Sequence, residues 1–169
     1  MRVWVRNLTK DFGFGINLPM EELKDVLSPH DEYIITESEV LDVGEYDSIY
    51  ELNNFLLYCK ENDISDETLE ILSKAMLYKE VIEAVEKESY IIVNFDSETA
   101  SWYEGRGGDI TNDSHKGMCL FDNNYYNPFG FEMEASIYDW IDWSSVWTQA
   151  TTENWQEVKV GLRNYLVHR

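Results

Sequence analysis

The pattern of hydrophobic and polar positions along the chain predicts short strands that alternate with short helices. Residues 2–8, RVWVRNL, alternate apolar and polar side chains with a period of two, which is typical of a strand. The glycine-punctuated residues 12–19 predict a turn, and Pro19 then opens a short helix that ends at Pro29. Residues 31–43 contain two apolar runs and predict one or two further strands.

The middle of the chain carries the clearest helical signals. In residues 47–62 apolar side chains recur every three to four positions, and Ser48 with Glu51 predicts a capping box at the start. A second helix is predicted to begin after Ser65, and a third to cover residues 78–87. Because the connections between these helices are short, they indicate a small helical bundle.

The remainder of the chain mixes both patterns. Residues 89–96, SYIIVNFD, predict a buried strand. Residues 104–117 predict a long flexible loop, and residues 118–122, MCLFD, predict another strand. The aromatic and acidic residues 133–147, MEASIYDWIDWSSVW, predict one helix, and residues 154–169 predict one or two closing strands.

The helix over 133–147 mixes indoles with carboxylates. Helical spacing places Ile137, Trp140 and Ile141 on one side, so we expect the Trp140 indole to face the core. Asp139 and Trp143 then share a partly exposed stripe. A rigid aromatic base that carries carboxylates is the structure that this pattern predicts.

Together these elements indicate the α+β class. We predict an elongated chain of three parts. They are a small mixed α/β domain over residues 1–60, a central helical bundle over residues 61–88 and a C-terminal α+β domain over residues 89–169.

The most unusual property of the sequence is its charge. The chain has 33 acidic and 13 basic residues, a net charge of −20, while its 44% hydrophobic content indicates a folded protein. Residues 31–70 carry a net charge of −12 and residues 91–157 a net charge of −10, whereas residues 1–30 are neutral. A chain this acidic is a poor partner for free nucleic acid or an anionic membrane, and a good partner for a basic protein surface.

The cysteines and the start of the chain bear on its location. Cys59 and Cys119 have neither CxxC nor zinc-finger spacing, so we expect reduced, buried thiols in a cytoplasmic protein. The first residues are too charged for a signal peptide, and no apolar run reaches membrane-spanning length.

Candidate catalytic chemistry is sparse. Asp109, Asp113 and His115 could approach a metal ion, but chance clustering in so acidic a loop is the favoured interpretation. An alternative hypothesis is a magnesium-dependent nuclease: Asp142 lies upstream of the E-x-K sequence formed by Glu157 and Lys159, so two carboxylates could hold the metal while the lysine orients water. The favoured prediction is a non-enzyme without metal or cofactor.

The acidic blocks suggest a different function. Duplex DNA carries one negative charge per roughly 1.7 Å of its axis. Twenty net charges at that density correspond to roughly 34 Å of duplex, about one helical turn. A rigid protein with this charge density would offer a DNA-binding groove the same electrostatic field as DNA.

Several stretches resemble one known family, the ArdA antirestriction proteins. They are VWVRNL at residues 3–8, DEYIITESEV at 31–40, SIYELN at 48–53, SYIIVNFD at 89–96 and ASIYDWIDWSSVW at 135–147. The resemblance covers about the first 95 residues and the last of these stretches, while residues 98–130 and the tail after Trp147 depart from the family pattern.

The resemblance implies a DNA mimic, encoded by a mobile genetic element, that acts in the cytoplasm of a bacterial host. Family members form curved, three-domain homodimers that occupy the DNA-binding groove of Type I restriction–modification enzymes. An alternative within this anti-defence class is an anti-CRISPR protein, since the channels of RNA-guided nucleases are also basic. The carboxylates expected to form the DNA-mimicking acidic surface are Glu37, Glu39, Asp42, Glu45, Asp47, Glu51, Glu61, Asp63, Asp66, Glu67, Glu70, Asp139 and Asp142.

Overall fold

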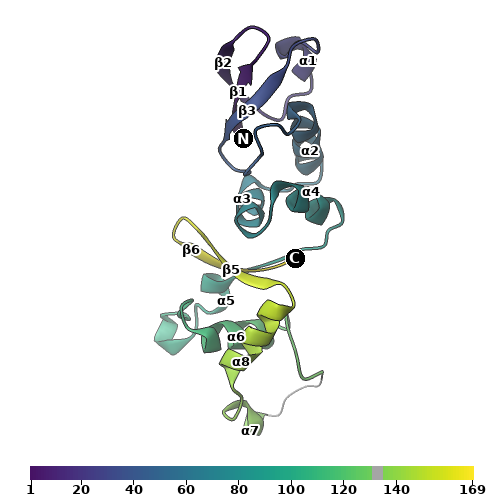
Figure 1. Ribbon diagram of the computed structural model, residues 1–169. Helices are drawn as coiled ribbons and strands as arrows, with labels where there is room; N and C mark the ends of the chain where they lie inside the picture. Colours follow the sequence, from purple (N-terminus) through teal and green to yellow (C-terminus); the bar gives the residue numbers. More distant parts are fainter. Residues whose placement is uncertain (131–134) are drawn as a thin grey trace. The chain divides into compact units, whose positions relative to one another are not determined.

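The structure, a computed structural model, describes residues 1–130 and 135–169 and belongs to the α+β class that the sequence predicts. It divides into two compact units, unit 1 over residues 1–88 and unit 2 over residues 89–169 (Figure 1). The expected boundary after residue 88 coincides with this division. Among the described residues no helix has the length and apolar character needed to cross a membrane.

A three-stranded antiparallel sheet begins unit 1. Its strands are β1 (Arg2–Asn7), β2 (Phe12–Asn17) and β3 (Tyr33–Ser38), in the order β2-β1-β3. The alternation of β1 is as predicted, with Val3 and Val5 buried.

The expectation of a turn over residues 12–19 is wrong, because β2 occupies most of this segment. Gly13 and Gly15 suggested a turn, yet they pair with Arg6 and Trp4 of β1. A Cβ at Gly15 would lie 3.1 Å from the Arg2 guanidinium and 3.4 Å from the Trp4 indole nitrogen. Glycine in this strand therefore makes room for the large side chains of its neighbour.

Unit 1 also contains four helices, of which α1 precedes β3, and the predicted N-caps Ser48 and Ser65 are confirmed. The helices are α1 (Leu23–Val26), α2 (Ile49–Glu61), α3 (Asp66–Ala75) and α4 (Tyr78–Glu86). The Ser48 hydroxyl accepts a hydrogen bond from the backbone N–H of Glu51 at 3.3 Å, and the Ser65 hydroxyl accepts one from Thr68 at 3.0 Å.

Helix α1 begins later than the sequence predicts. The side chain of the buried residue Asn53 on α2 accepts a hydrogen bond from the backbone N–H of Met20 at 2.7 Å and donates one to its carbonyl at 2.8 Å. Because both backbone groups of Met20 are bonded to Asn53, they are unavailable for a helical turn.

Helix α2 ends at Glu61, next to the expected domain boundary between residues 60 and 61, and both lie within unit 1. Helix α3 is joined to the segment after β3, because the Ser73 hydroxyl accepts a hydrogen bond from the backbone N–H of Asp42 at 2.9 Å. The apolar faces of α2, α3 and α4 bury Leu52, Leu72 and Val81, which are fully inaccessible to solvent.

Unit 2 contains a second antiparallel sheet covered by helices. Its strands are β4 (Ile91–Asn94), β5 (Trp155–Val160) and β6 (Arg163–His168), in the order β4-β6-β5. The helices are α5 (Phe95–Glu98), η1 (Tyr103–Gly105, a 3₁₀ turn), α6 (Asp113–Asp122), α7 (Ala135–Tyr138) and α8 (Trp143–Thr152). The predicted strands at 154–169 are confirmed. The predicted buried strand at 89–96 is confirmed only in part, because Phe95 and Asp96 begin α5 and Ile91 is exposed.

Two other expectations for unit 2 are wrong. Residues 118–122 belong to α6, in which Cys119 and Leu120 are buried at consecutive helical positions. In the segment 133–147, residues 133 and 134 lie outside the described residues, and the remainder forms two helices separated by residues 139–142.

This interruption reverses the expected roles of the indoles. Trp140 lies in the connection and is 86% exposed, whereas Trp143 and Trp147 on α8 are 7% and 6% exposed. The continuous helical spacing that placed Trp140 toward the core does not apply across the break.

Both cysteines are buried free thiols, as predicted. Burial raises the pKa of Cys59 to about 11 and that of Cys119 to about 12. Both thiols are therefore protonated and unreactive at neutral pH.

Helices α6 and α8 approach each other closely at Gly117. A Cβ at this position would lie 2.1 Å from the carbonyl oxygen of Trp143. The neighbouring residue Lys116 places its ammonium 4.8 Å from the centre of the Trp147 ring. The absence of a side chain at Gly117 permits the close approach of α6 and α8. The contact between Lys116 and Trp147 is a cation–π interaction between the same two helices.

Replacing Gly117 by alanine should destabilise the protein, because the backbone of α8 would have to move. We expect the free energy of unfolding to fall by about 1–3 kcal/mol or more, measured by urea denaturation. Gly13→Ala is the matched control, since the nearest atom to its added methyl group is the Val5 carbonyl oxygen at 3.5 Å. Equal losses in the two variants would contradict this account of Gly117.

Candidate acidic surface

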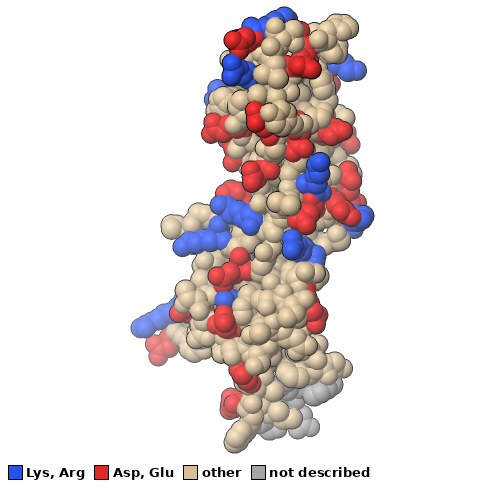
Figure 2. Space-filling view, viewed as in Figure 1, with Lys and Arg blue, Asp and Glu red and all other residues tan. Residues whose placement is uncertain are grey.

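Unit 1 holds eleven of the thirteen carboxylates predicted to form the acidic surface, and unit 2 holds Asp139 and Asp142. All thirteen residues are exposed except Asp47 and Glu70, which are half-buried. Unit 1 contains 21 acidic and 8 basic residues, a net charge of −13. Figure 2 shows the acidic side chains of unit 1 spread over the visible face, with basic side chains between them.

The end of β3 and the segment after it position the first group. The Glu39 carboxylate accepts a hydrogen bond from the backbone N–H of Arg2 at 2.9 Å, and the Glu39 N–H donates to the Arg2 carbonyl at 3.1 Å. Leu41, which is 1% exposed, anchors the segment in the core between exposed Glu39 and Asp42. An apolar anchor and backbone hydrogen bonds thus hold the carboxylates outward.

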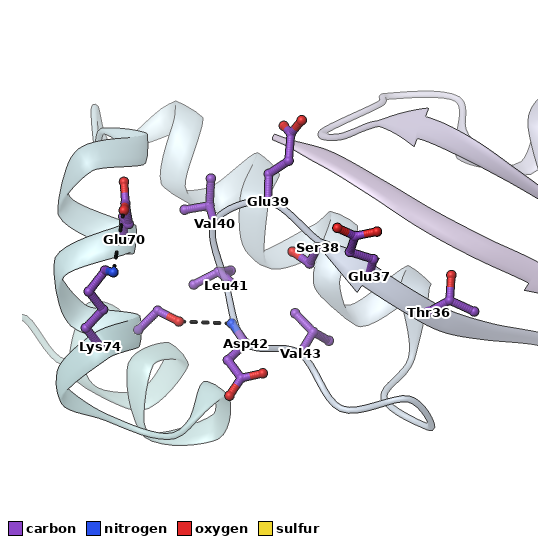
Figure 3. A pocket seen from close by; sticks show the side chains of 11 residues that line it. Thr36, Glu37, Ser38, Glu39, Val40, Leu41, Asp42, Val43, Glu70 and Lys74 are labelled. Atoms are coloured by element: carbon purple, nitrogen blue, oxygen red, sulfur yellow. Dashed lines mark hydrogen bonds and ion pairs between the residues drawn. The ribbon is translucent and has the colours of Figure 1, made fainter. Parts of the chain in front are cut away.

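A surface pocket of about 520 Å³ collects four of these carboxylates. Figure 3 shows Glu70 and Lys74 on α3 opposite the segment that carries Glu39 and Asp42, with Glu37 further along β3. The Lys74 ammonium lies 3.9 Å from the Glu70 carboxylate, at the limit of an ion pair. Four carboxylates against one ammonium give the pocket a negative charge.

The next carboxylates lie around the start of α2. Asp47 accepts a hydrogen bond from the backbone N–H of Gly44 at 2.9 Å, and its carboxylate lies 3.9 Å from the Lys79 ammonium. Glu45 is exposed in the preceding turn, and Glu51 is exposed in the first turn of α2, where the helix dipole stabilises a negative charge.

The connection from α2 to α3 carries four more candidates. Glu61 ends α2 and Asp63 occupies a left-handed conformation with φ 56° in the connection. Asp66 and Glu67 lie in the first turn of α3, again at the favourable end of a helix dipole. The N-terminal ammonium of Met1 lies 3.7 Å from the Asp66 carboxylate.

The closest ion pairs of unit 1 involve carboxylates outside the predicted acidic surface. Arg6 pairs with Asp11 at 2.6 Å and Lys10 with Asp31 at 2.8 Å. The hydrogen bond from Lys10 lowers the pKa of Asp31. Within the predicted set, Glu70 and Asp47 lie 3.9 Å from the ammonium groups of Lys74 and Lys79, and Asp66 lies 3.7 Å from the N-terminal ammonium. These three distances are longer than those of the Arg6 and Lys10 pairs.

In unit 2, Asp142 has a structural role that sequence reasoning missed. It is the N-cap of α8 and accepts hydrogen bonds from the backbone N–H groups of Ser144 at 3.2 Å and Ser145 at 3.4 Å. The two serine hydroxyls also donate to it, at 2.7 and 2.6 Å. These hydrogen bonds lower the pKa of Asp142. The D-x-S-S sequence is itself an N-cap signal.

The residues of the nuclease hypothesis have other partners in the structure. The Glu157 carboxylate accepts a hydrogen bond from the Lys116 ammonium at 2.7 Å, which also pairs with Asp113 at 2.7 Å. Burial lowers the pKa of Lys116, but the hydrogen bonds to these two carboxylates outweigh it and raise the pKa. Lys159 is exposed on β5, two residues beyond Glu157, and Asp142 caps α8.

The predicted flexible loop over residues 104–117 is wrong at its end, because Asp113 and His115 lie in α6. The candidate metal ligands of this segment also have other partners. His115 accepts a hydrogen bond at Nδ1 from the backbone N–H of Asp109 at 2.8 Å, and its Nε2 is hydrogen-bonded to the Tyr103 hydroxyl at 3.0 Å. Asp113 pairs with Lys116. Across residues 1–130 and 135–169, no group of three histidine, cysteine, aspartate or glutamate residues could hold a metal ion.

Comparison with known proteins supplies no relative: no family model matches the chain, and neither does any curated protein.

Because Asp142 caps α8, its replacement should destabilise the protein. Asp142→Ala should lower Tm by about 4–8 °C, the effect of losing a typical N-cap in a unit of this size. Because its pKa is lowered in the folded state, the stabilisation is present above the unfolded-state pKa of about 4 and is lost as pH falls through the folded-state pKa.

Asp142→Asn is the control, since asparagine caps as well as aspartate but is uncharged. Its Tm at neutral pH should stay near that of the unchanged protein in thermal unfolding followed by circular dichroism. An equal loss in the Asn and Ala variants would contradict the capping role.

Proposed function

We propose that the protein inhibits a DNA-binding defence enzyme by presenting a DNA-like acidic surface to its DNA-binding groove. The observation that carries this proposal is the arrangement of unit 1, in which eleven carboxylates between Glu37 and Glu70 stand on one folded scaffold and nine of the eleven are exposed. In this proposal the protein acts by occupancy, without catalysis, metal or cofactor.

The scaffold suits such a role. Ordering flexible acidic side chains on a loose chain would cost conformational entropy on binding. Here the backbone N–H groups of Glu39 and Asp42 donate hydrogen bonds to the Arg2 carbonyl and the Ser73 hydroxyl. Capped helices carry Glu51, Asp66 and Glu67. Much of the conformational entropy of these residues is therefore lost during folding and not on binding.

The proposed target is a Type I restriction–modification enzyme of a bacterial host cell, to which the resemblance of the sequence to ArdA proteins points. Antirestriction on behalf of a mobile genetic element is the corresponding biological role, with a homodimer as the proposed state of the inhibitor. An RNA-guided CRISPR nuclease is the alternative target, because its channels bind nucleic-acid backbones by the same charge complementarity.

The proposal predicts graded effects of charge removal. Glu37→Gln alone should raise the concentration for half-maximal inhibition of DNA cleavage by less than about threefold. The triple variant Glu37→Gln, Glu39→Gln, Asp42→Asn should raise it by about tenfold or more, because each lost charge weakens the same field. Inhibition by the unchanged protein should weaken as salt rises.

The control is a triple variant with the same change in net charge at Glu83, Glu86 and Glu88, which are exposed residues of unit 1 outside the acidic surface. It should inhibit almost as well as the unchanged protein. If the two triple variants lose inhibition equally, net charge and not the position of the acidic surface is responsible. If a single Asp→Asn change abolishes activity, an active site is the better explanation.

A further inference from the structure

Trp140 is the most exposed aromatic side chain among the described residues, at 86%. It lies in the connection between α7 and α8, whereas its neighbours Trp143 and Trp147 are buried. An indole exposed to this extent gains little from burial in the core. Exposed tryptophans of this kind are frequent anchors in protein interfaces.

The connection that carries Trp140 is anchored on both sides. The Tyr138 hydroxyl donates to both carboxylate oxygens of Asp122, at 2.8 and 2.9 Å, and the Tyr138 ring lies 4.5 Å from the ring of Trp143. The backbone N–H of Trp140 donates to the Ile137 carbonyl at 2.9 Å, and Asp142 caps α8 immediately afterwards. The indole thus projects from a connection whose two ends are held.

The surroundings of Trp140 are acidic. Asp139 and Asp142, one residue before and two after, are both exposed. The sequence contains no lysine or arginine between Lys116 and Lys159. A complementary site must therefore combine a slot for a flat aromatic ring with positive charge at its rim.

That combination is the chemistry of a nucleotide site. A nucleotide presents a flat base beside anionic phosphates. Methyltransferases that modify DNA turn the target base out of the duplex into a pocket, where it stacks between aromatic or apolar side chains. Basic side chains along the DNA-binding groove hold the neighbouring phosphates. An indole is a bicyclic ring close to a purine in size.

We propose that Trp140 enters the base-binding pocket of the modification subunit of its target, with Asp139 and Asp142 in place of the flanking phosphates. This inference rests on the proposed function, and it adds a shape-specific anchor to a surface otherwise recognised by charge. It also gives the unexpected break between α7 and α8 a function, because a continuous helix would not project the indole in this way.

Leu162 supplies a matched control within the same unit. It is 92% exposed at the tip of the β5–β6 hairpin and is followed by Arg163 instead of being flanked by carboxylates. Its removal takes away exposed apolar surface without touching an acidic site.

The test is the Kd of the protein for a purified Type I modification methyltransferase, measured without DNA. Trp140→Ala should raise the Kd by roughly 5- to 150-fold, the range for losing one stacked base, while Trp140→Phe recovers most of the affinity and Leu162→Ala changes it less than about twofold. The salt dependence of binding should be the same for Trp140→Ala and the unchanged protein, since no charge is lost. Because the indole is exposed, Tm should not change.

A double-mutant cycle tests whether Trp140 binds in the base-binding pocket. With a methyltransferase whose base-stacking aromatic residue is replaced by alanine, Trp140→Ala should no longer weaken binding. If the loss persists, or if Trp140→Ala binds as well as the unchanged protein, the inference is wrong while the proposed function stands. If the unchanged protein does not bind the enzyme, the proposed target is wrong, and the inference is then wrong as well.

Discussion

Repulsion among like charges is the constraint on which the rest of unit 1 depends. A net charge of −13 on 88 residues opposes compaction. Folding fixes the distances between the carboxylates, so they cannot move apart to reduce their repulsion. The ion pairs of Arg6 and Lys10 oppose this repulsion. Further opposing contributions come from uncharged groups: the buried aliphatic faces of α2, α3 and α4, the capping serines and the hydrogen bonds that hold the segment after β3. Helix N-termini lower the cost further, because several carboxylates lie where the dipole favours them.

The elements that the sequence predicts best are those specified by local chemistry. Ser48 and Ser65 are followed by helical apolar spacing, and both caps form where expected. The exposure of the predicted acidic residues is also expected from the sequence, since charged side chains on a folded chain almost always face water. Ten of these residues are simply the carboxylates of residues 37–67, and the structure leaves nine of these ten exposed.

Features that depend on contacts between distant residues could not be predicted. Glycines at 13 and 15 indicate a turn until the bulky side chains of β1 are placed beside them. The five-residue run 118–122 is too short to separate strand from helix. The break that exposes Trp140 is different, because it has a local signal that was missed: Asp142 acts as an N-cap, which competes with helix continuation. The ion pair between Lys116 and Glu157 joins residues 41 positions apart and has no local signal.

The central claim is that the protein and DNA occupy the same groove, and mutually exclusive binding tests it most directly. A Type I restriction–modification enzyme is saturated with a fluorescent cognate duplex, the protein is titrated in, and free, binary and ternary species are separated by analytical ultracentrifugation. The account predicts that the protein releases the duplex and that no ternary complex sediments. A stable ternary complex of enzyme, duplex and protein would contradict it.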